Sequence, residues 1–194
     1  MDLVSRVKGI LLSPKHEWAT IDTEAATVGS LFTGYIMPLA AIPAIAGFIG
    51  SSIIGRSFMG VYAKSSISSG LTSAIIGFVM SLVSCYVMAL IIDALAPSFG
   101  GQKSQIQALK VAAYSSTAAW LAGIATIVPA ASILGLVALY SLYLLYVGLP
   151  VLMKAPAEKA MGYTVVVIIA SIILYVVVAA IVVAVAGTGM MLGR

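Results

Sequence analysis

Residues 163–186 read YTVVVIIASIILYVVVAAIVVAVA, a run that contains no charged side chain. A helix needs about 20 apolar residues to cross a hydrocarbon core roughly 30 Å thick. Strands of a membrane β-barrel alternate between apolar and polar residues, whereas this run is continuously apolar. The run therefore predicts a membrane-spanning α-helix that faces lipid.

Four further apolar runs precede this one and predict spans over residues 29–54, 71–96, 108–128 and 131–153. Charged residues make up only 8% of the 194 residues and hydrophobic residues 62%, which leaves too little charge to cover a soluble domain. We therefore expect an all-α polytopic membrane protein. Its five transmembrane helices should form one domain, residues 29–187, followed by a short tail at 188–194.

Two details of these runs leave alternatives open. Only Pro129-Ala130 separates the third run from the fourth, which predicts an antiparallel hairpin of two spans. The alternative is one long broken helix over residues 108–153, but the total length favours two crossings. Pro38 and Pro43 interrupt the first run and predict a broken first span.

The first 28 residues are polar enough to stay outside the hydrocarbon core. Apolar positions recur at helical spacing over residues 3–12 and predict a short amphipathic helix in the interface plane. Ser13 and Pro14 suit the start of a second helix. Basic side chains off the apolar face, and a tryptophan in the second helix, are typical of anchors at the lipid headgroups. The expected anchors are Arg6, Lys8 and Trp18.

Basic residues are distributed unevenly between the two sides of the predicted spans. If the N-terminus is cytoplasmic, seven of the ten Lys and Arg residues lie on that side. Cytoplasmic loops carry an excess of Lys and Arg, so we expect the N-terminus inside and the C-terminus outside. Anionic lipid headgroups are then a more natural contact for these cations than nucleic acid. The seven residues are Arg6, Lys8, Lys15, Lys103, Lys110, Lys154 and Lys159.

Small residues recur at four-residue spacing on two of the predicted spans, where another helix can approach closely. They predict packing within the chain or, alternatively, the seam of a homodimer. The two sets are Ser73, Gly77 and Ser81 in one span, and Ser115, Ala119 and Gly123 in the next.

Asp93 is the one acidic residue inside a predicted span. A carboxylate there is costly unless it is paired, hydrated or protonated. Lys110 begins the next span after a short connection, so we expect the two residues to be neighbours. One interpretation is an ion pair that fixes the helix register. The other is an ion or proton site, or a polar binding pocket that faces the cytoplasm.

Tyr140, Tyr143 and Tyr146 form a band on one side of the fourth span. They predict hydrogen bonds between helices or, alternatively, the wall of a polar cavity. Lys154, Glu158 and Lys159 form a charged loop that either anchors the protein at the cytoplasmic surface or provides a docking surface there. Further tyrosines that could line such a cavity are Tyr35, Tyr86 and Tyr114.

The sequence contains no motif that predicts catalysis. No G-x-x-x-x-G-K-[ST] loop and no H-E-x-x-H motif occurs, and the chain has one histidine, His16. We therefore expect no enzymatic activity, no metal and no cofactor.

Several segments together resemble the bacterial branch of the Yip1 family. They are LVSRVKGILLSP at residues 3–14 with Trp18, TGYIMPL at 33–39, YLLYVGLP at 143–150, KAPAEKA at 154–160, and Gly162-Tyr163. The resemblance implies five spans, a cytoplasmic N-terminus and an external C-terminus in a bacterial inner membrane. Eukaryotic members are associated with Rab GTPases and vesicle traffic. This chain lacks their Asp-Leu-Tyr-Gly-Pro signature and long N-terminus, which argues against a GTPase partner.

Two classes of function are compatible with the sequence. The first is a non-enzymatic membrane scaffold or adaptor that acts through the N-terminal helix, the charged loop at residues 154–159 and self-association. The second is a small ion or solute transporter or channel. Its path would run near Asp93, Lys110 and the tyrosines of the fourth span, and the prolines of the first span favour it because broken helices expose backbone groups.

Overall fold

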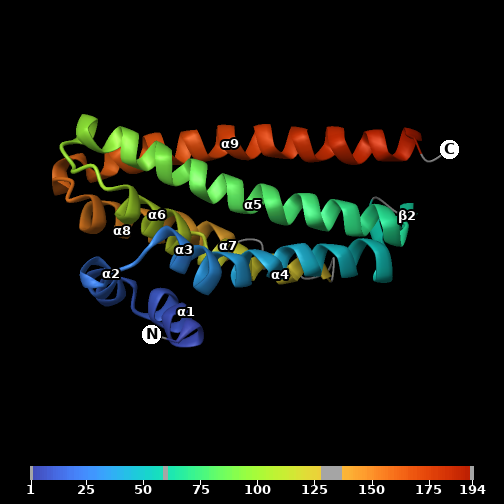
Figure 1. The fold of residues 1–194 in the computed structure, drawn as a ribbon, viewed down its shortest axis with the longest axis horizontal. Helices are drawn as coiled ribbons and strands as arrows, with labels where there is room; N and C mark the ends of the chain where they lie inside the picture. The colour runs from blue at the N-terminus through green and yellow to red at the C-terminus, as the bar shows by residue number, and fades with distance from the viewer. Residues whose placement is uncertain (1, 59–60, 128–136, 193–194) are drawn as a thin grey trace.

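The computed structural model describes residues 2–58, 61–127 and 137–192. Its longest helices run along one axis and form an elongated bundle, with the described N-terminal residues at one end and the C-terminal residues at the other (Figure 1). Two short helices, α1 (Leu3–Leu12) and α2 (Pro14–Thr23), lie against the N-terminal end. Both begin where the sequence predicts, although Ser13 makes no side-chain cap at the start of α2.

The first long helical segment is continuous rather than broken at its prolines. Pro38 lies in the first turn of α4, and Pro43 lies inside that helix. Proline lacks an N–H and crowds the preceding turn, and the wider π-helical turn before α4 can accommodate that crowding. The parts in order are α3 (Val28–Leu31), η1 (Phe32–Ile36), α4 (Met37–Phe48) and η2 (Ile49–Ile54).

The predicted all-α class holds except for a short hairpin at the far end of the bundle. Strands β1 (Arg56–Phe58) and β2 (Val61–Ala63) pair antiparallel, with Ser57 opposite Tyr62. Gly55 precedes β1 with a φ of 89°, a conformation that glycine adopts without strain. The hairpin leads into α5 (Ile67–Leu95), which ends in the 3₁₀ turn η3 (Ala96–Phe99).

The third predicted span is divided. Its helices are α6 (Gln105–Ser115), α7 (Thr117–Ala122) and the 3₁₀ turn η4 (Gly123–Ile127). The hydroxyls of Ser115 and Ser116 both donate to the carbonyl of Ala112, at 3.3 and 2.7 Å. Such bonds compete with the helical backbone ladder and explain the break between α6 and α7.

The last two helices differ from their predicted bounds. The fourth predicted span appears as the shorter α8 (Tyr140–Met153), and the predicted turn at Pro129-Ala130 lies outside the described residues. The final helix α9 (Ala157–Leu192) extends past residue 187, so the predicted tail is helical as far as Leu192.

Among the described residues, three helical segments are long and apolar enough to cross a membrane: Val28–Ile54, Ile67–Phe99 and Ala157–Ala180. These correspond to the first, second and fifth predicted spans. The segment Val137–Met153 is apolar but shorter. The chain is therefore a helical membrane protein with three long helices and shorter helical segments packed between them.

Gly50 marks the closest approach between the first long segment and η4. A Cβ at this position would overlap the carbonyl oxygen of Thr126, a backbone atom that cannot rotate away. Gly50→Ala is therefore expected to lower the free energy of unfolding by about 1–3 kcal/mol. Thermal unfolding in detergent measures the effect. Gly47→Ala is the matched control because nothing lies within 4 Å of its Cβ, and equal stability of the two variants would contradict the close approach.

Candidate functional site

A buried ion network joins α1 to α2. The guanidinium of Arg6 donates a 2.6 Å hydrogen bond to Glu17 and also pairs with Glu24. The side chains of Arg6 and Glu17 are only 5% and 6% exposed, and the guanidinium lies 5.7 Å from the ring centroid of Tyr114 on α6. Burial disfavours the charge, but the bond to Glu24 and the nearby carboxylates outweigh it and raise the pKa of Arg6. Arg6 therefore stays charged inside the protein.

Lys110 attaches α6 to the end of α2. Its ammonium donates to the backbone carbonyls of Ile21 and Glu24, at 2.8 and 2.6 Å, and the residue is 3% exposed. A cation is stabilised at a helix C-terminus, where carbonyl groups lack helical partners. The predicted ion pair with Asp93 is therefore not formed, because Lys110 is bound to α2 instead.

Trp18 is the hydrophobic contact beneath this network. Its side chain is fully buried, and its ring meets Tyr114 edge-on with centroids 6.2 Å apart. A Cβ on Gly148 of α8 would lie 2.6 Å from the Trp18 ring, so the glycine gives the indole its space. Trp18 and Arg6 are thus buried protein contacts, which corrects the prediction that they contact headgroups. Of the three predicted anchors, Lys8 is the exposed one.

The remaining contacts of the N-terminal hairpin, as we call α1 and α2 together, come from α8 and the loop after it. Tyr140 donates from its hydroxyl to the carbonyl of Leu11, at 2.9 Å. Lys154, which ends α8 in a left-handed conformation, forms an ion pair with Asp22. Helices α6 and α8 therefore both hold the hairpin in place.

The other predicted site residues do not form one site: Tyr143 packs on Tyr140, with ring centroids 5.3 Å apart, and Glu158 and Lys159 lie on a different helix. Tyr143 and Tyr146 are each 40% exposed on α8, and neither lines a cavity described below. Glu158 and Lys159 are exposed at the start of α9. The hydroxyl of Tyr35 is hydrogen-bonded to that of Thr117, and the hydroxyl of Tyr86 accepts a hydrogen bond from the side-chain amide of Gln105. These tyrosines therefore join helices rather than line a path.

Asp93 is half-buried near the end of α5. Its Oδ1 atom is buried and has no hydrogen-bond partner among the described residues. The neighbouring carbonyl of Ile92 accepts a bond from Tyr163 on α9, and the Tyr163 ring stacks on Phe99 at 4.9 Å. Asp93 thus lies in aromatic rather than cationic surroundings.

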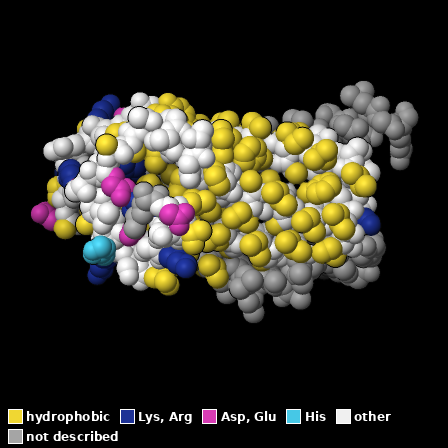
Figure 2. Space-filling view, turned by 60° about the horizontal axis from the view of Figure 1, so that its bottom comes forward, with side chains coloured by type: hydrophobic (Ala, Val, Ile, Leu, Met, Phe, Trp, Pro, Cys, Tyr) yellow, Lys and Arg dark blue, Asp and Glu magenta, His cyan; other side chains and the backbone are white. Residues whose placement is uncertain are grey.

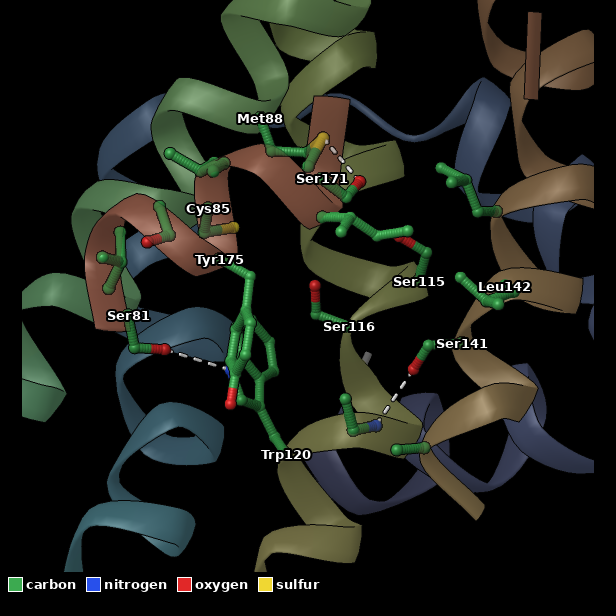
Figure 3. Close-up of a pocket in the computed structure, with 17 residues that line it drawn as sticks. Ser81, Cys85, Met88, Ser115, Ser116, Trp120, Ser141, Leu142, Ser171 and Tyr175 are labelled. Carbon is green, nitrogen blue, oxygen red and sulfur yellow. Dashed lines mark hydrogen bonds between the residues drawn. The ribbon is translucent and has the colours of Figure 1, made fainter. Parts of the chain in front are cut away.

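A cavity of about 430 Å³ lies between α5, α6, α7, α8 and α9 (Figure 3). We call it the serine cavity, because six serines line it: Ser81, Ser84, Ser115, Ser116, Ser141 and Ser171. The sequence predicts a role for Ser81 and Ser115 only as small residues at helix contacts. The other four serines of the cavity carry one signal in the sequence, which is that serine recurs on otherwise apolar helices.

The two predicted small-residue faces differ in how they are packed. Ser73, Gly77 and Ser81 line a second cavity of about 640 Å³, between α4, α5, α7 and α9. Gly123, at the end of the other face, packs on α4, where its Cβ would lie 2.5 Å from that of Pro43. Packing inside the chain is therefore confirmed at Gly123. No described atom lies within 4 Å of a Cβ at Gly77, so the homodimer seam stays a prediction for that face.

Comparison with known proteins gives one family and a pair of relatives. A family model described as the Yip1 domain matches residues 8–189. Two proteins called inner membrane protein YohC, from Escherichia coli strains K12 and CFT073, are each 30% identical over 166 residues. The alignment covers 83% of this chain and 85% of each relative. No solved structure matches the chain.

Proposed function

The chain belongs to the Yip1 domain family, and from this premise we propose that it is a non-enzymatic scaffold or adaptor of the bacterial inner membrane. The location is supported by the relatives, whose names place them in the inner membrane of Escherichia coli. In this role the protein would organise the bilayer or recruit a partner at the cytoplasmic surface.

The observation that carries this proposal is the concentration of charge at one end of the bundle. This end holds all six acidic residues and seven of the ten basic residues. They lie in residues 2–24, at the end of α5, in the loop before α6 and its first turns, at the end of α8, and at the start of α9. Figure 2 shows acidic and basic side chains gathered on the surface of one end, while the described surface beyond them is mostly hydrophobic. A charged end beside an apolar body suits contacts with anionic headgroups and with a soluble partner.

The proposed topology has five crossings, with the N-terminus in the cytoplasm and the C-terminus outside. The placement of the described terminal residues at opposite ends supports an odd number of crossings (Figure 1). Residues 105–127 and α8 would supply the two shorter crossings. The excess of Lys and Arg at the N-terminal end supports the orientation.

The contacts at the site favour a scaffold over a transporter. Lys110 and Tyr140, two components of the predicted path, both bind backbone carbonyls of the hairpin. Of the predicted path residues, Asp93 keeps a buried oxygen without a partner among the described residues. One such oxygen is a weak basis for an ion path, which needs successive sites.

Two measurements test the scaffold against the transporter. Ion and proton flux through proteoliposomes is expected to equal that of protein-free vesicles for both wild type and Asp93→Asn. A photoreactive residue at position 159 is expected to give a discrete cross-linked product in living cells. The same residue in place of Lys64, at the opposite end of the bundle, is the control. Flux that disappears in Asp93→Asn would overturn the proposal in favour of a transporter.

A further inference from the structure

The serine cavity lies halfway along the bundle. Ser81, in its wall, is the central residue of α5 (Ile67–Leu95). The described residues that line it include no Lys, Arg, His, Asp or Glu. An ion that entered would lose its hydration without meeting an opposite charge, which is costly inside a membrane. The occupant that fits this cavity is therefore uncharged.

The hydroxyls of the cavity divide into two kinds. Ser84, Ser115, Ser116 and Ser171 donate to carbonyls three or four residues earlier in the chain, which leaves their oxygens as acceptors. The Ser171 hydroxyl also lies 3.5 Å from the sulfur of Met88 (Figure 3). The oxygen of Ser81 accepts from the indole of Trp120, and that of Ser141 accepts from the backbone N–H of Ala119. Neither of these two hydroxyls donates to another described residue, so each has a free hydrogen. The cavity thus offers acceptors and donors to a hydroxyl or ester group.

The cavity opens toward the lipid between α8 and α9. Leu142 on α8 and Ile172 and Tyr175 on α9 line it, yet they are 40%, 58% and 74% exposed. Figure 3 shows Leu142 and Tyr175 on different sides of the cavity. The exposed neighbours on α9, Ile169 and Ile173, are aliphatic, as expected of a lipid-facing surface. An occupant would enter from the hydrocarbon rather than from water.

The volume limits the size of the occupant. One water takes roughly 30 Å³ in the liquid, so about 430 Å³ holds on the order of 14 non-hydrogen atoms. That is one alkyl chain or one small head with part of its chain. The second cavity shares six lining residues with the first, Trp120 and Tyr175 among them. It provides room for the part of the chain that the first cavity does not hold.

We infer that the serine cavity binds an uncharged single-chain lipid with a hydroxyl-bearing head, of the monoacylglycerol class. The serines hydrogen-bond the head, the apolar wall accommodates the chain, and the gap between α8 and α9 is the entrance. This binding site is separate from the charged end of the protein and goes beyond the proposed scaffold function.

Photolabelling tests the inference on the full-length protein in phosphatidylcholine nanodiscs. The probe is a monoacylglycerol with a diazirine in its chain, and mass spectrometry locates the attached label. The label is expected on cavity residues of α5, α8 and α9. Unlabelled monoacylglycerol should compete, whereas a fatty acid and an alkyl trimethylammonium of the same chain length should not. Equal competition by the charged chains would overturn the inference.

A matched pair of variants on α9 separates the cavity from the outer surface. Ser171→Phe fills the cavity, so labelling should fall roughly tenfold or more, as steric exclusion from an apolar pocket predicts. Ile173→Phe adds the same ring on the lipid-facing side and should leave labelling unchanged. Label spread along the outer face of α9, and unaffected by Ser171→Phe, would show ordinary lipid contact only. If Ser171→Phe does not fold, the competition experiment with charged and uncharged chains on the wild-type protein still tests the inference.

Discussion

Arg6→Ala is expected to release the N-terminal hairpin and to lower the free energy of unfolding by about 3–5 kcal/mol, the cost of breaking a buried ion pair. The substitution leaves the carboxylate of Glu17, 6% exposed, without its cation. It also removes the partner of Glu24 and the cation over the Tyr114 ring. A buried charge without a partner costs more than the lost contact alone.

Hydrogen exchange and thermal unfolding in detergent measure this effect. Exchange should rise throughout α1 and α2, while α5 should keep its protection. Lys8→Ala is the matched control, because Lys8 is exposed on the same helix and should change stability by no more than about 0.5 kcal/mol. An Arg6→Ala protein with a protected hairpin would show that the ion network does not hold α1 in place.

Trp18→Ala is expected to destabilise the protein by about 3–5 kcal/mol, as truncation of a buried aromatic residue does. The indole is fully buried between Tyr114 and Gly148. Its Nε1 makes no hydrogen bond to any described residue, so Trp18→Phe removes area without removing a bond and should cost less. The loss should again be localised to the hairpin.

Gly148→Leu provides an independent test from the other side of the same contact. A side chain there would occupy the position of the Trp18 ring and should displace α2 without any change in α2 itself. Leu12→Ala, at a position 79% exposed on α1, is the control. Protease cleavage between α2 and α3 reports the displacement. If Gly148→Leu resists the protease as wild type does, the ring is not seated on Gly148.

The long helices could be predicted from the sequence because each one contains a long apolar run. The break between α6 and α7 and the pairing of β1 with β2 could not be predicted, because local hydrogen bonds decide both. Ser115 and Ser116 look like small residues in an apolar run, yet their bonds to Ala112 end α6. The β-hairpin formed by β1 and β2 carries no strong turn signal of the Asn-Gly kind, so the sequence does not predict the pairing of these strands.

The site was harder to predict than the fold, because the partners of its polar residues lie far away in the sequence. Arg6 and Trp18 were interpreted as headgroup anchors from composition alone, since a basic residue and a tryptophan near a span are typical of anchors. Lys110 was matched to Asp93, its closest acid across a short loop. Its actual partners, carbonyls at the end of α2, carry no signal in the sequence.

The contacts of the N-terminal hairpin also set an order of assembly. Lys110 is 86 residues beyond Glu24, and Lys154 is 132 residues beyond Asp22. At about 5–20 residues per second, the ribosome delivers the last of these contacts on the order of ten seconds after the hairpin has emerged. During that interval α1 has α2 beside it but lacks its contact with α8, and the bilayer surface is the nearest substitute. The amphipathic pattern that suggests a permanent interfacial helix thus suits a nascent chain that waits at the membrane until α8 is complete.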